Sequence, residues 1–399
     1  MSVPGWLLQR LVVAGGAVPF RTVMEWVLHD PEHGAYGSGR LRIGPRGDFA
    51  TAPSLGPDFA ALLAAQLADW LLQLDPARPG QRPLALVEAG PGEGSLAADL
   101  AAALAAGWPE LAARTELVLV EPNAGMAARQ RQRLAGCPLP CRWASFAELA
   151  EAPLRGVLLA HEVLDALAVE RIEWDGALWR RQQVVLHGGA GAVAPALRLQ
   201  PGEPLEPAAG EALQALQALQ ALGLLPPSPQ RPPGWCTELH PGLEPWLRQA
   251  AGALSAGALL VIDYALEAWR YYAPQRANGT LMAYRGQQAC ADPLIAPGEA
   301  DLTAHLCIDS LERAAAATGW HRLGGCRQGE ALLALGLAQR LHGLQGDPGG
   351  LAQLLPRREA LLRLVDPHAL GDFRWLAYTR GPQQLAIPRF LQEPPGPNG

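Results

Sequence analysis

A glycine-rich turn directly after an apolar segment constrains the fold of this chain more than any other feature of its sequence. The segment Leu84–Ala89 leads without a break into Gly90–Gly94 (GPGEG), and an alanine-rich stretch follows. Glycine lets the backbone bend sharply and approach a ligand without a Cβ clash, and a helix that begins here offers free N–H groups. This order of strand, turn and helix predicts a βαβ unit that binds a nucleotide-like cofactor.

The alternation of short apolar segments with alanine-rich ones extends this unit into a larger sheet. Such alternation is typical of parallel strands with helices between them, and near-continuous apolar character suits strands that are buried on both faces. Strands are predicted at Leu84–Ala89, Glu116–Glu121, Arg142–Ala144, Gly156–His161, Ala258–Tyr264, His321–Cys326 and Asp372–Tyr378, with a helix near Ser310–Thr318. The expected fold is therefore α/β, with a Rossmann-like sheet.

Changes in this pattern divide the chain into segments. Two stretches with helical spacing of apolar residues, Arg21–Leu28 and Phe59–Leu74, precede the first strand. After the fourth strand the alternation breaks: a hairpin-like stretch surrounds Asp175-Gly176, and a repeat at Ala212–Gly223 predicts a scaffold helix or a linker. The predicted segments are an N-terminal helical cap (1–80), the first half of the core (81–165), a helical and hairpin insertion on the substrate or partner side (166–254) and the second half of the core with helical additions (255–399).

The spacing of the glycines separates two classes of cofactor. A dinucleotide-binding turn, G-x-G-x-x-G, needs a third glycine where this chain has Ser95, and its glycine falls one residue earlier, at Gly94. The pattern Glu-x-Gly-x-Gly-x-Gly, which begins at Glu88, is typical of class I methyltransferases. S-adenosylmethionine has no pyrophosphate, so the turn would surround its amino-acid part, and Glu88 could hold the ammonium group directly or through water. A tight turn without a ligand is the alternative.

The ends of the next two strands extend the predicted cofactor site. Glu121 ends the second strand, where an acidic side chain can accept hydrogen bonds from both ribose hydroxyls. Ser145 and Phe146 follow the third strand and would meet the adenine, although Phe146 suits the core equally well. The predicted cofactor-binding residues are Glu88, Gly90, Gly92, Gly94, Glu121, Ser145 and Phe146.

Polar side chains at the end of the fourth strand are the predicted catalytic residues, namely His161, Glu162 and Asp165. Ligands and reacting groups converge at the carboxyl ends of strands in open sheets. Glu162 could orient a cationic methyl acceptor such as a guanidinium, and Asp165 could assist it or cap a following helix. His161 is either a base or a hydrogen-bonded loop residue, and surface acids in a loop are the alternative for both carboxylates.

Composition excludes several other functions. The net charge of −6 argues against nucleic acid as a partner, because phosphate binding needs clustered cations. The six cysteines are scattered and include no CxxC pair, so no metal site is expected. No apolar run reaches the ~18 residues that span a bilayer. The N-terminus lacks the features of a secretory signal or a transit peptide, which favours the cytoplasm of a bacterium.

A series of short motifs occurs in this chain in the same order as in a known family. They lie at residues 29–34 (HDPEHG), 47–53 (GDFATAP), 86–94 (LVEAGPGEG), 162–167 (EVLDAL), 262–264 (IDY), 279–285 (GTLMAYR) and 297–305 (PGEADLTAH). The series resembles the MidA-like methyltransferases, which include the mitochondrial arginine methyltransferase required for assembly of respiratory complex I. The chain departs from the family pattern at His161, where an asparagine is usual, and at Ala265, where a glycine is usual. These departures concern the acceptor side rather than the cofactor turn.

The resemblance implies a class I methyltransferase fold, S-adenosylmethionine as the methyl donor and a protein arginine as the acceptor, in a subunit of a quinone oxidoreductase. It also implies that Asp263 or Asp301 adds to the polarity of the acceptor pocket. The walls of this pocket would be tyrosines, unless these are ordinary half-buried residues: Tyr264, Tyr271, Tyr272 and Tyr284.

Two other functions compete with this interpretation. The first is an assembly chaperone that binds S-adenosylmethionine only as a structural ligand, without essential methyl transfer. The second is an NAD-dependent oxidoreductase, which Ser95 disfavours because it breaks the dinucleotide-binding fingerprint.

Overall fold

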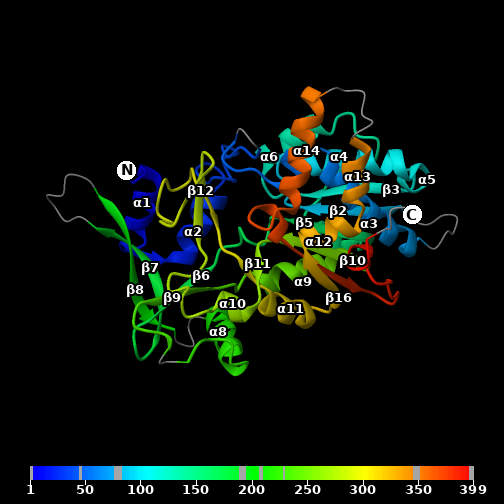
Figure 1. Cartoon of the computed structure of the whole chain (residues 1–399). Coiled ribbons are helices and arrows are strands. Elements are labelled where there is room, and N and C mark those ends of the chain that lie inside the picture. Colours follow the sequence, from blue (N-terminus) through cyan, green and yellow to red (C-terminus); the bar gives the residue numbers. More distant parts are fainter. Residues whose placement is uncertain are drawn as a thin grey trace.

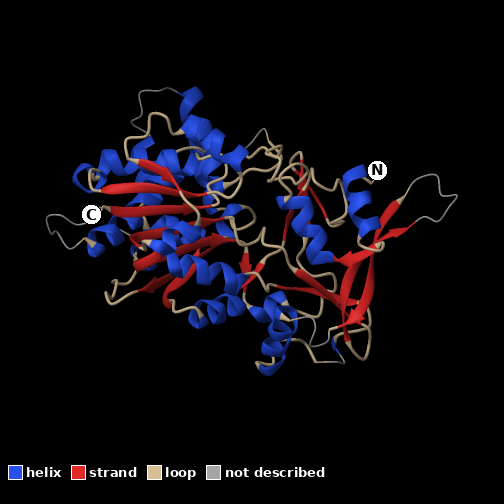
Figure 2. Cartoon of the chain, turned by 180° about the vertical axis from the view of Figure 1, so that it is seen from behind, coloured by secondary structure: helices blue, strands red, loops and turns tan. Residues whose placement is uncertain are grey.

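The computed structural model describes residues 3–44, 47–75, 83–187, 195–205, 210–227, 230–344 and 351–394. Its elements form two units that lie side by side in Figure 1 and, from behind, in Figure 2. One unit is a helix-covered sheet that contains β2, β3, β5 and β10. The other contains α1, α2 and the strands β6 to β9.

The larger unit is built on a seven-stranded sheet with the order β16-β17-β10-β5-β2-β3-β4. Neighbouring strands from β10 to β4 are parallel, whereas β17 is antiparallel to both β10 and β16. The strands are β2 (Leu84–Ala89), β3 (Thr115–Val120), β4 (Cys141–Trp143), β5 (Leu154–His161), β10 (Leu254–Asp263), β16 (His321–Arg327) and β17 (Arg374–Arg380). Every predicted strand is present to within a few residues, and the predicted Rossmann-like α/β sheet is confirmed.

Both faces of this sheet are buried, which explains why its strands are apolar at successive positions. In β2, Leu84 and Leu86 pack into the hydrophobic cluster on one face, whereas Ala85 and Val87 pack into the cluster on the other. The first face is covered by α3 (Asp58–Leu74), α4 (Ser95–Gly107), α12 (Gln328–Ala334), α13 (Leu337–Gly343) and α14 (Leu351–Val365). The second is covered by α7 (Phe146–Glu151), α9 (Leu243–Ala253) and α11 (Ile308–Ala317).

The remaining short elements of the larger unit connect these layers. They are α5 (Pro109–Ala112), α6 (Ala124–Arg133) and the 3-10 turns Ala52–Leu55, Leu370–Asp372 and Arg389–Leu391. The short helix α10 (Ala268–Tyr271) instead packs in a hydrophobic cluster of the smaller unit. A short parallel pair, β11 (Ala265–Leu266) and β15 (Leu306–Cys307), continues from the end of β10. Ala265 packs into the second cluster of the sheet and Leu266 into a cluster of the smaller unit, so this pair lies at the junction of the two.

The smaller unit is built on a five-stranded antiparallel sheet with the order β1-β7-β6-β9, in which β8 also pairs with β7. Its strands are β1 (Ala17–Pro19), β6 (Glu170–Trp174), β7 (Trp179–His187), β8 (Ala196–Pro204) and β9 (Trp235–Leu239). The predicted hairpin is the turn between β6 and β7, where Gly176 has φ 105°. The alanine-leucine-glutamine repeat forms α8 (Glu211–Ala221), as expected for a scaffold helix.

The N-terminal helices α1 (Gly5–Val13) and α2 (Phe20–His29) pack on this unit together with a second small sheet. That sheet has the order β13-β12-β14 and consists of β12 (Met282–Arg285), β13 (Gln288–Cys290) and β14 (Asp301–Thr303). Phe20 and Met24 of α2 share one hydrophobic cluster with Val184 of β7 and Leu302 of β14. Three elements that are distant in the sequence, α2, β7 and β14, therefore share one hydrophobic core.

The predicted segment boundaries stay predictions, but hydrophobic packing crosses them. The helix α3 lies in the predicted N-terminal cap and packs against the large sheet, as does α9 of the predicted insertion. Conversely, β12 and β14 of the predicted second core half pack with α2. A sequence pattern reports which face of an element is apolar, whereas the partner of that face is decided by the whole chain.

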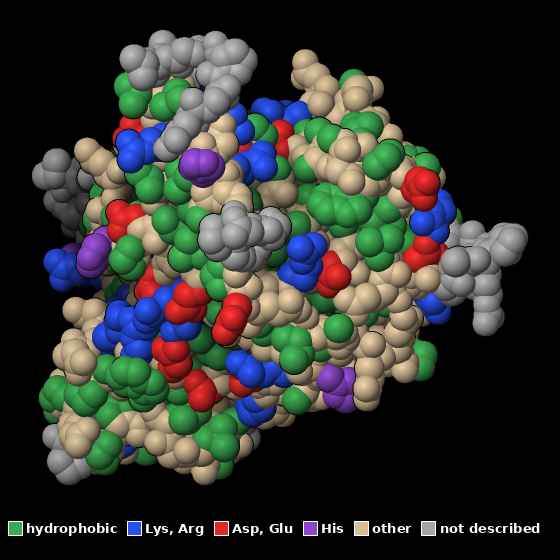
Figure 3. Space-filling model, turned by 45° about the vertical axis from the view of Figure 1, so that its right-hand side comes forward, with side chains coloured by type: hydrophobic (Ala, Val, Ile, Leu, Met, Phe, Trp, Pro, Cys, Tyr) green, Lys and Arg blue, Asp and Glu red, His purple; other side chains and the backbone are tan. Residues whose placement is uncertain are grey.

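The surface carries charges of both signs. On the face that Figure 3 shows, arginine and acidic side chains lie next to one another. Among the described helices, none is long and apolar enough to cross a membrane.

Candidate functional site

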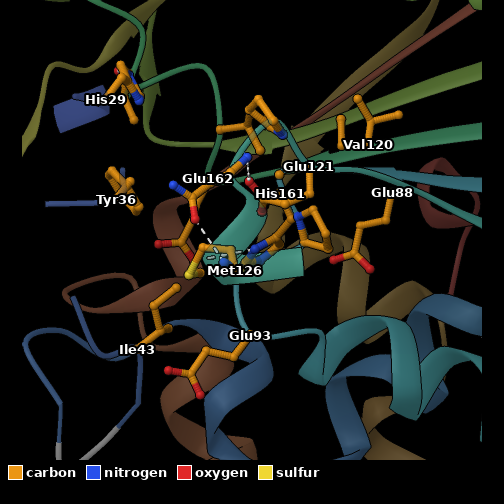
Figure 4. Close-up of a pocket in the computed structure, with 18 of the residues that line it drawn as sticks. His29, Tyr36, Ile43, Glu88, Glu93, Val120, Glu121, Met126, His161 and Glu162 are labelled. Carbon is orange, nitrogen blue, oxygen red and sulfur yellow. Dashed lines mark hydrogen bonds and ion pairs between the residues drawn. The ribbon is translucent and has the colours of Figure 1, made fainter. Parts of the chain in front are cut away.

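A cavity of about 780 Å³ lies where the carboxyl ends of β2, β3 and β5 meet α2 and the loop that follows it. The strand side contributes Glu88, Val120 and His161, and the opposite side contributes His29 and Tyr36. In Figure 4, His29 and Tyr36 lie toward one side of the view and Glu88 toward the other, with Glu162 between them. Both units therefore line the cavity. Of the predicted site residues, all except Gly94 and Asp165 lie in its wall.

The glycine turn has a backbone conformation that other residues rarely adopt. Gly90, Gly92 and Gly94 have φ 60°, 51° and 77°. A Cβ atom at Gly90 would lie 2.8 Å from a methyl carbon of Val163, and one at Gly92 would lie 3.0 Å from the Cδ1 atom of Ile43. The turn is therefore a cradle that a side chain would fill. Gly94 is the N-cap of α4, behind the cavity wall.

Glu88 is a buried carboxylate one residue before the end of β2. The residue is only 3% exposed, and within the described part of the chain its Oε2 atom has no hydrogen-bond donor. Burial raises the pKa of Glu88 to about 8. A cation in the cavity would favour the ionised form, so this carboxylate is suited to hold an ammonium group.

Glu121 directly follows β3 and is held at both oxygen atoms. Its Oε1 atom accepts a hydrogen bond from the Asn123 N–H at 2.8 Å, and its Oε2 atom accepts one from the Gln130 side-chain amide at 2.9 Å. Burial raises the pKa of Glu121, and these two hydrogen bonds act in the opposite direction. The carboxylate is thus fixed in place at the cavity wall, as recognition of a ribose would require.

Ser145 and Phe146 occupy the first turn of α7. Ser145 is the N-cap, and its capping box with Glu148 joins the Ser145 N–H to the carboxylate at 2.6 Å and the Glu148 N–H to the serine Oγ at 3.2 Å. Phe146 packs edge-on against Trp246 in the core and also lines the cavity. The position of Phe146 therefore agrees with both interpretations, namely contact with the adenine and packing in the core.

Glu162 has a strained backbone at the end of β5. Its φ of 52° is rare for a residue with a side chain, and its N–H donates to the Ile262 carbonyl of β10 at 2.9 Å. The backbone N–H of Ala52 donates to its carboxylate, whereas the Oε1 atom has no hydrogen-bond partner among the described residues. Burial, and then the nearby Asp165 and Asp301, raise the pKa of Glu162 well above its usual value.

Three further carboxylates surround Glu162. Asp263 ends β10 and accepts hydrogen bonds from the N–H groups of Leu164 and Asp165 at 3.1 and 3.3 Å. Asp301 of β14 pairs with the Tyr36 side chain, while its Oδ1 atom has no partner among the described residues. Burial raises the pKa of Asp263 to about 8 and that of Asp301 to about 7, and it raises that of Asp165 well above its usual value.

Glu162, Asp165, Asp263 and Asp301 form an acidic cluster. Within the described ranges, no arginine forms an ion pair with any of the four. The described residues also include no group of three or more His, Cys, Asp and Glu side chains arranged to hold a metal ion. The suggestion that Asp165 caps a helix is wrong, because the chain turns from β5 into β6 without an intervening helix.

His161 lies in an aromatic environment. Its ring meets Phe59 edge-on with the centroids 5.4 Å apart, and it stacks on Phe373 at 6.4 Å. Burial lowers the pKa of His161 to about 3, so the imidazole is neutral near pH 7. Its Nδ1 atom lies 3.5 Å from Glu162 Oε1, but a neutral ring forms no ion pair with a carboxylate.

The tyrosines fall into two groups. Burial, and then the carboxylates of the acidic cluster, raise the pKa of Tyr264 and Tyr284, which places both side chains near that cluster. Tyr271 and Tyr272 instead pack in a hydrophobic cluster of the smaller unit, and the Tyr271 hydroxyl bonds to Glu238 at 3.1 Å. The suggestion that these two form the acceptor wall is therefore wrong.

Sequence reasoning missed two residues of the site, Tyr36 and Gln130. Tyr36 lies within a glycine-rich loop, where periodicity gives no signal, although it stands two residues after the end of the HDPEHG motif. Gln130 is a polar residue in the polar helix α6, and only its complete burial distinguishes it.

Comparisons with known proteins agree with this geometry. Residues 62–326 match the family model of S-adenosyl-L-methionine-dependent methyltransferases. A COG1565 superfamily member from Burkholderia thailandensis, whose crystal structure contains bound S-adenosyl-homocysteine, superposes with a TM-score of 0.80 at 30% identity, covering 99% of both chains. The mitochondrial protein arginine methyltransferase NDUFAF7 of Mus musculus is 26% identical over 92% of this chain and 81% of its own. The NDUFAF7 homolog of Drosophila melanogaster is 26% identical over 94% and 84%.

Proposed function

This chain belongs to the family of S-adenosyl-L-methionine-dependent methyltransferases, and on that basis we propose that it methylates an arginine side chain of a partner protein. The enzyme class, the class I fold and S-adenosylmethionine as the cofactor are confirmed. The observation that carries the choice of acceptor is the buried acidic cluster, with which no arginine in the described part of the chain forms an ion pair. The names of the mitochondrial relatives point to the same acceptor.

The strand side of the cavity fits the cofactor. The cradle at Gly90 and Gly92 would surround its amino-acid part, and the Glu88 carboxylate would hold its ammonium group. Glu121 would accept hydrogen bonds from the ribose, and Ser145 and Phe146 would border the adenine. When bound, S-adenosylmethionine supplies an electrophilic methyl group on its sulfonium sulfur.

The acidic cluster fits a guanidinium better than an ammonium group. A guanidinium presents five N–H donors in a planar fork, so it can serve several carboxylates at once, whereas an ammonium group is a compact point charge. Glu162 lines the cavity and would accept the first pair of hydrogen bonds, and Asp165 and Asp301 would supply further negative charge. Desolvation of these carboxylates is unfavourable until a cation compensates for it.

The same carboxylates could accept the proton that the reaction releases. A guanidinium nitrogen that gains a methyl group must lose a proton, and an acceptor with a pKa near the working pH is best suited to take it. Burial raises the pKa of Asp301 to about 7, which meets this requirement. The catalytic role of His161 stays a prediction, and its lowered pKa makes the imidazole a weak base.

The identity of the partner also belongs to the proposal. The motif series favours a subunit of a quinone oxidoreductase, methylated in the cytoplasm of a bacterium. The strand-rich smaller unit lines the acceptor side of the cavity through Tyr36 and His29, and we assign it to the partner side.

Mass spectrometry of arginine-containing peptides tests this function. We would compare a strain with the protein, a strain without it, and a strain that carries Glu162→Gln. The expected result is a methylated arginine at one site of one protein, absent in the second strain and strongly reduced in the third. Identical arginine methylation in all three strains would contradict the proposal. Normal assembly of the partner complex without any methylation would favour the chaperone.

A further inference from the structure

Gln130 lies behind the cofactor side of the cavity wall, next to Gly92 and Glu121, which line it, although nothing in the sequence marks this glutamine. The residue belongs to α6 and is completely buried. Its amide nitrogen donates to the Gly92 carbonyl at 2.7 Å and to the Glu121 Oε2 atom at 2.9 Å. One side chain therefore joins the glycine turn to the acid that follows β3.

The orientation of this amide is fixed by a third hydrogen bond. The indole Nε1–H of Trp143, in β4, donates to the Gln130 oxygen at 2.8 Å. An indole nitrogen can only donate, so the oxygen of the amide must face Trp143 and the nitrogen must face Gly92 and Glu121. Both hydrogens of the amide are then used.

These contacts leave defined positions on Glu121. A carboxylate has two oxygen atoms with about two lone-pair positions each. Gln130 occupies one position on Oε2, and the Asn123 N–H occupies one on Oε1. One position remains on each oxygen, which matches the two hydroxyls of a ribose.

We propose that Gln130 is a positioning residue for the cofactor. It holds the Glu121 carboxylate toward the ribose and holds the turn at Gly92 in its positive-φ conformation. Through Trp143 it also connects these parts to the strand that precedes Ser145 and Phe146. The inference rests on the proposed role of Glu121 and is independent of the methyl acceptor.

A merely structural role for Gln130 would make a different prediction. A buried glutamine that only satisfies its neighbours would, when replaced, lower stability without a pH-dependent effect on ligand affinity. A positioning role instead requires a hydrogen-bond donor at the amide nitrogen. Gln130→Glu tests this difference, because the new group has nearly the same shape but donates only when it is protonated.

The experiment is a calorimetric titration with S-adenosyl-homocysteine at two pH values. At about pH 8 the new carboxylate faces that of Glu121, and we expect affinity at least about 30-fold below that of the unchanged protein. At about pH 5.5 the protonated group donates again, and we expect the deficit to shrink to several-fold. Gln132→Glu is the matched control, since it adds the same charge at an exposed position of α6, and its affinity should stay within about twofold at both pH values.

A second pair of variants separates the possible failures. Trp143→Phe keeps the ring but removes the donor that orients the amide, and we expect about a 3- to 10-fold loss of affinity. Glu121→Ala should weaken binding more than Trp143→Phe does. If Glu121→Ala binds normally, the ribose assignment fails and the inference fails with it.

If Glu121→Ala weakens binding, other outcomes overturn the role of Gln130 alone. The first is a loss of affinity in Gln130→Glu that is equally large at both pH values. The second is an affinity of Gln130→Glu equal to that of the unchanged protein. Thermal unfolding of the ligand-free variants shows whether they fold. If Gln130→Glu does not fold, Trp143→Phe decides the question, and unchanged affinity in that variant overturns the inference.

Discussion

The two halves of the cavity differ in how their polar groups are satisfied. In the cofactor half, Glu121, Gln130 and Ser145 all have hydrogen-bond partners within the protein. In the acceptor half, Glu162 Oε1 has none among the described residues, and the same holds for Oδ1 of Asp301, which lies outside the cavity wall beside Tyr36. The first half is held in place before a ligand arrives, whereas the second contains buried carboxyl groups with raised pKa values, which an incoming cation would ionise.

This difference indicates where each half obtains its binding energy. A preorganised site avoids the cost of ordering its side chains, so affinity should depend on shape and on the retained geometry. A desolvated cluster of like charges gains most from an incoming cation, so it should depend on charge and pH. Glu88 is the exception in the cofactor half, since its Oε2 atom has no donor in the described part of the chain and awaits an ammonium group.

The largest effect is expected from a change of shape in the cofactor half. Gly92→Val adds a branched side chain where a Cβ atom alone would lie 3.0 Å from Ile43, at a φ of 51°. We expect binding of S-adenosyl-homocysteine to fall by at least about 100-fold in calorimetric titration. Gly107→Ala in α4 is the control, because its Cβ atom meets nothing within 4 Å. Retained affinity in Gly92→Val would show that the turn does not contact the ligand.

The next effect comes from a change of charge in the acceptor half. Glu162→Gln keeps the shape of the side chain, and we expect methyl transfer to fall by about 10²-fold, since loss of a charged, oriented partner costs ~3 kcal/mol. Cofactor affinity should stay within a few-fold. Methyl transfer measured on the purified variant checks this, and an unchanged rate would remove Glu162 from the mechanism.

A smaller loss is expected from the acid that the smaller unit contributes. Asp301→Asn removes one negative charge from the cluster but leaves Glu162 in place, and we expect kcat/KM for the acceptor to fall by about tenfold. Glu299→Gln is the control, because Glu299 is half exposed and pairs with Arg285 at the surface. Equal effects of both substitutions would show that Asp301 has no special role.

The smallest predicted effect is a dependence on pH. Burial raises the pKa of Asp301 to about 7 and that of Asp263 to about 8, and a guanidinium binds the ionised carboxylates. Acceptor binding should therefore release protons, and kcat/KM for the acceptor should increase about fivefold from pH 6.5 to pH 8. A profile that falls over this range would contradict the assignment of the cluster as a cation site.

The same comparison explains how much of the molecule could be predicted from its sequence. The cofactor half comes mostly from one continuous βαβ unit, so Glu88, the glycines and Glu121 could be found from strand, turn and spacing. Gln130 could not, because a glutamine within a polar helix resembles a surface residue until the helix is packed. The parallel sheet was predictable for the same local reason, since continuous apolar segments identify strands that are buried on both faces.

The acceptor half depends on long-range packing and was predicted only in part. Glu162 and Asp165 follow one strand and could be located, although their exact roles stay predictions. Asp301 and Tyr36 meet only because α2 and β14 share a hydrophobic cluster, which no local pattern indicates. The pairing of β1 with β7 joins equally distant segments. The prediction for Tyr271 was wrong because its closeness to Tyr264 in the sequence does not show which of the two units buries its side chain.

The most direct test of the central claim uses a labelled methyl group. Purified protein would be incubated with S-adenosylmethionine that carries an isotopically labelled methyl group and with an extract of cells that lack the protein. Tandem mass spectrometry would then locate the label. The account predicts label on a guanidinium nitrogen of one arginine in one protein, and far less label with Glu162→Gln. Label on a different chemical group, or no label from a protein that still binds S-adenosyl-homocysteine, would contradict it.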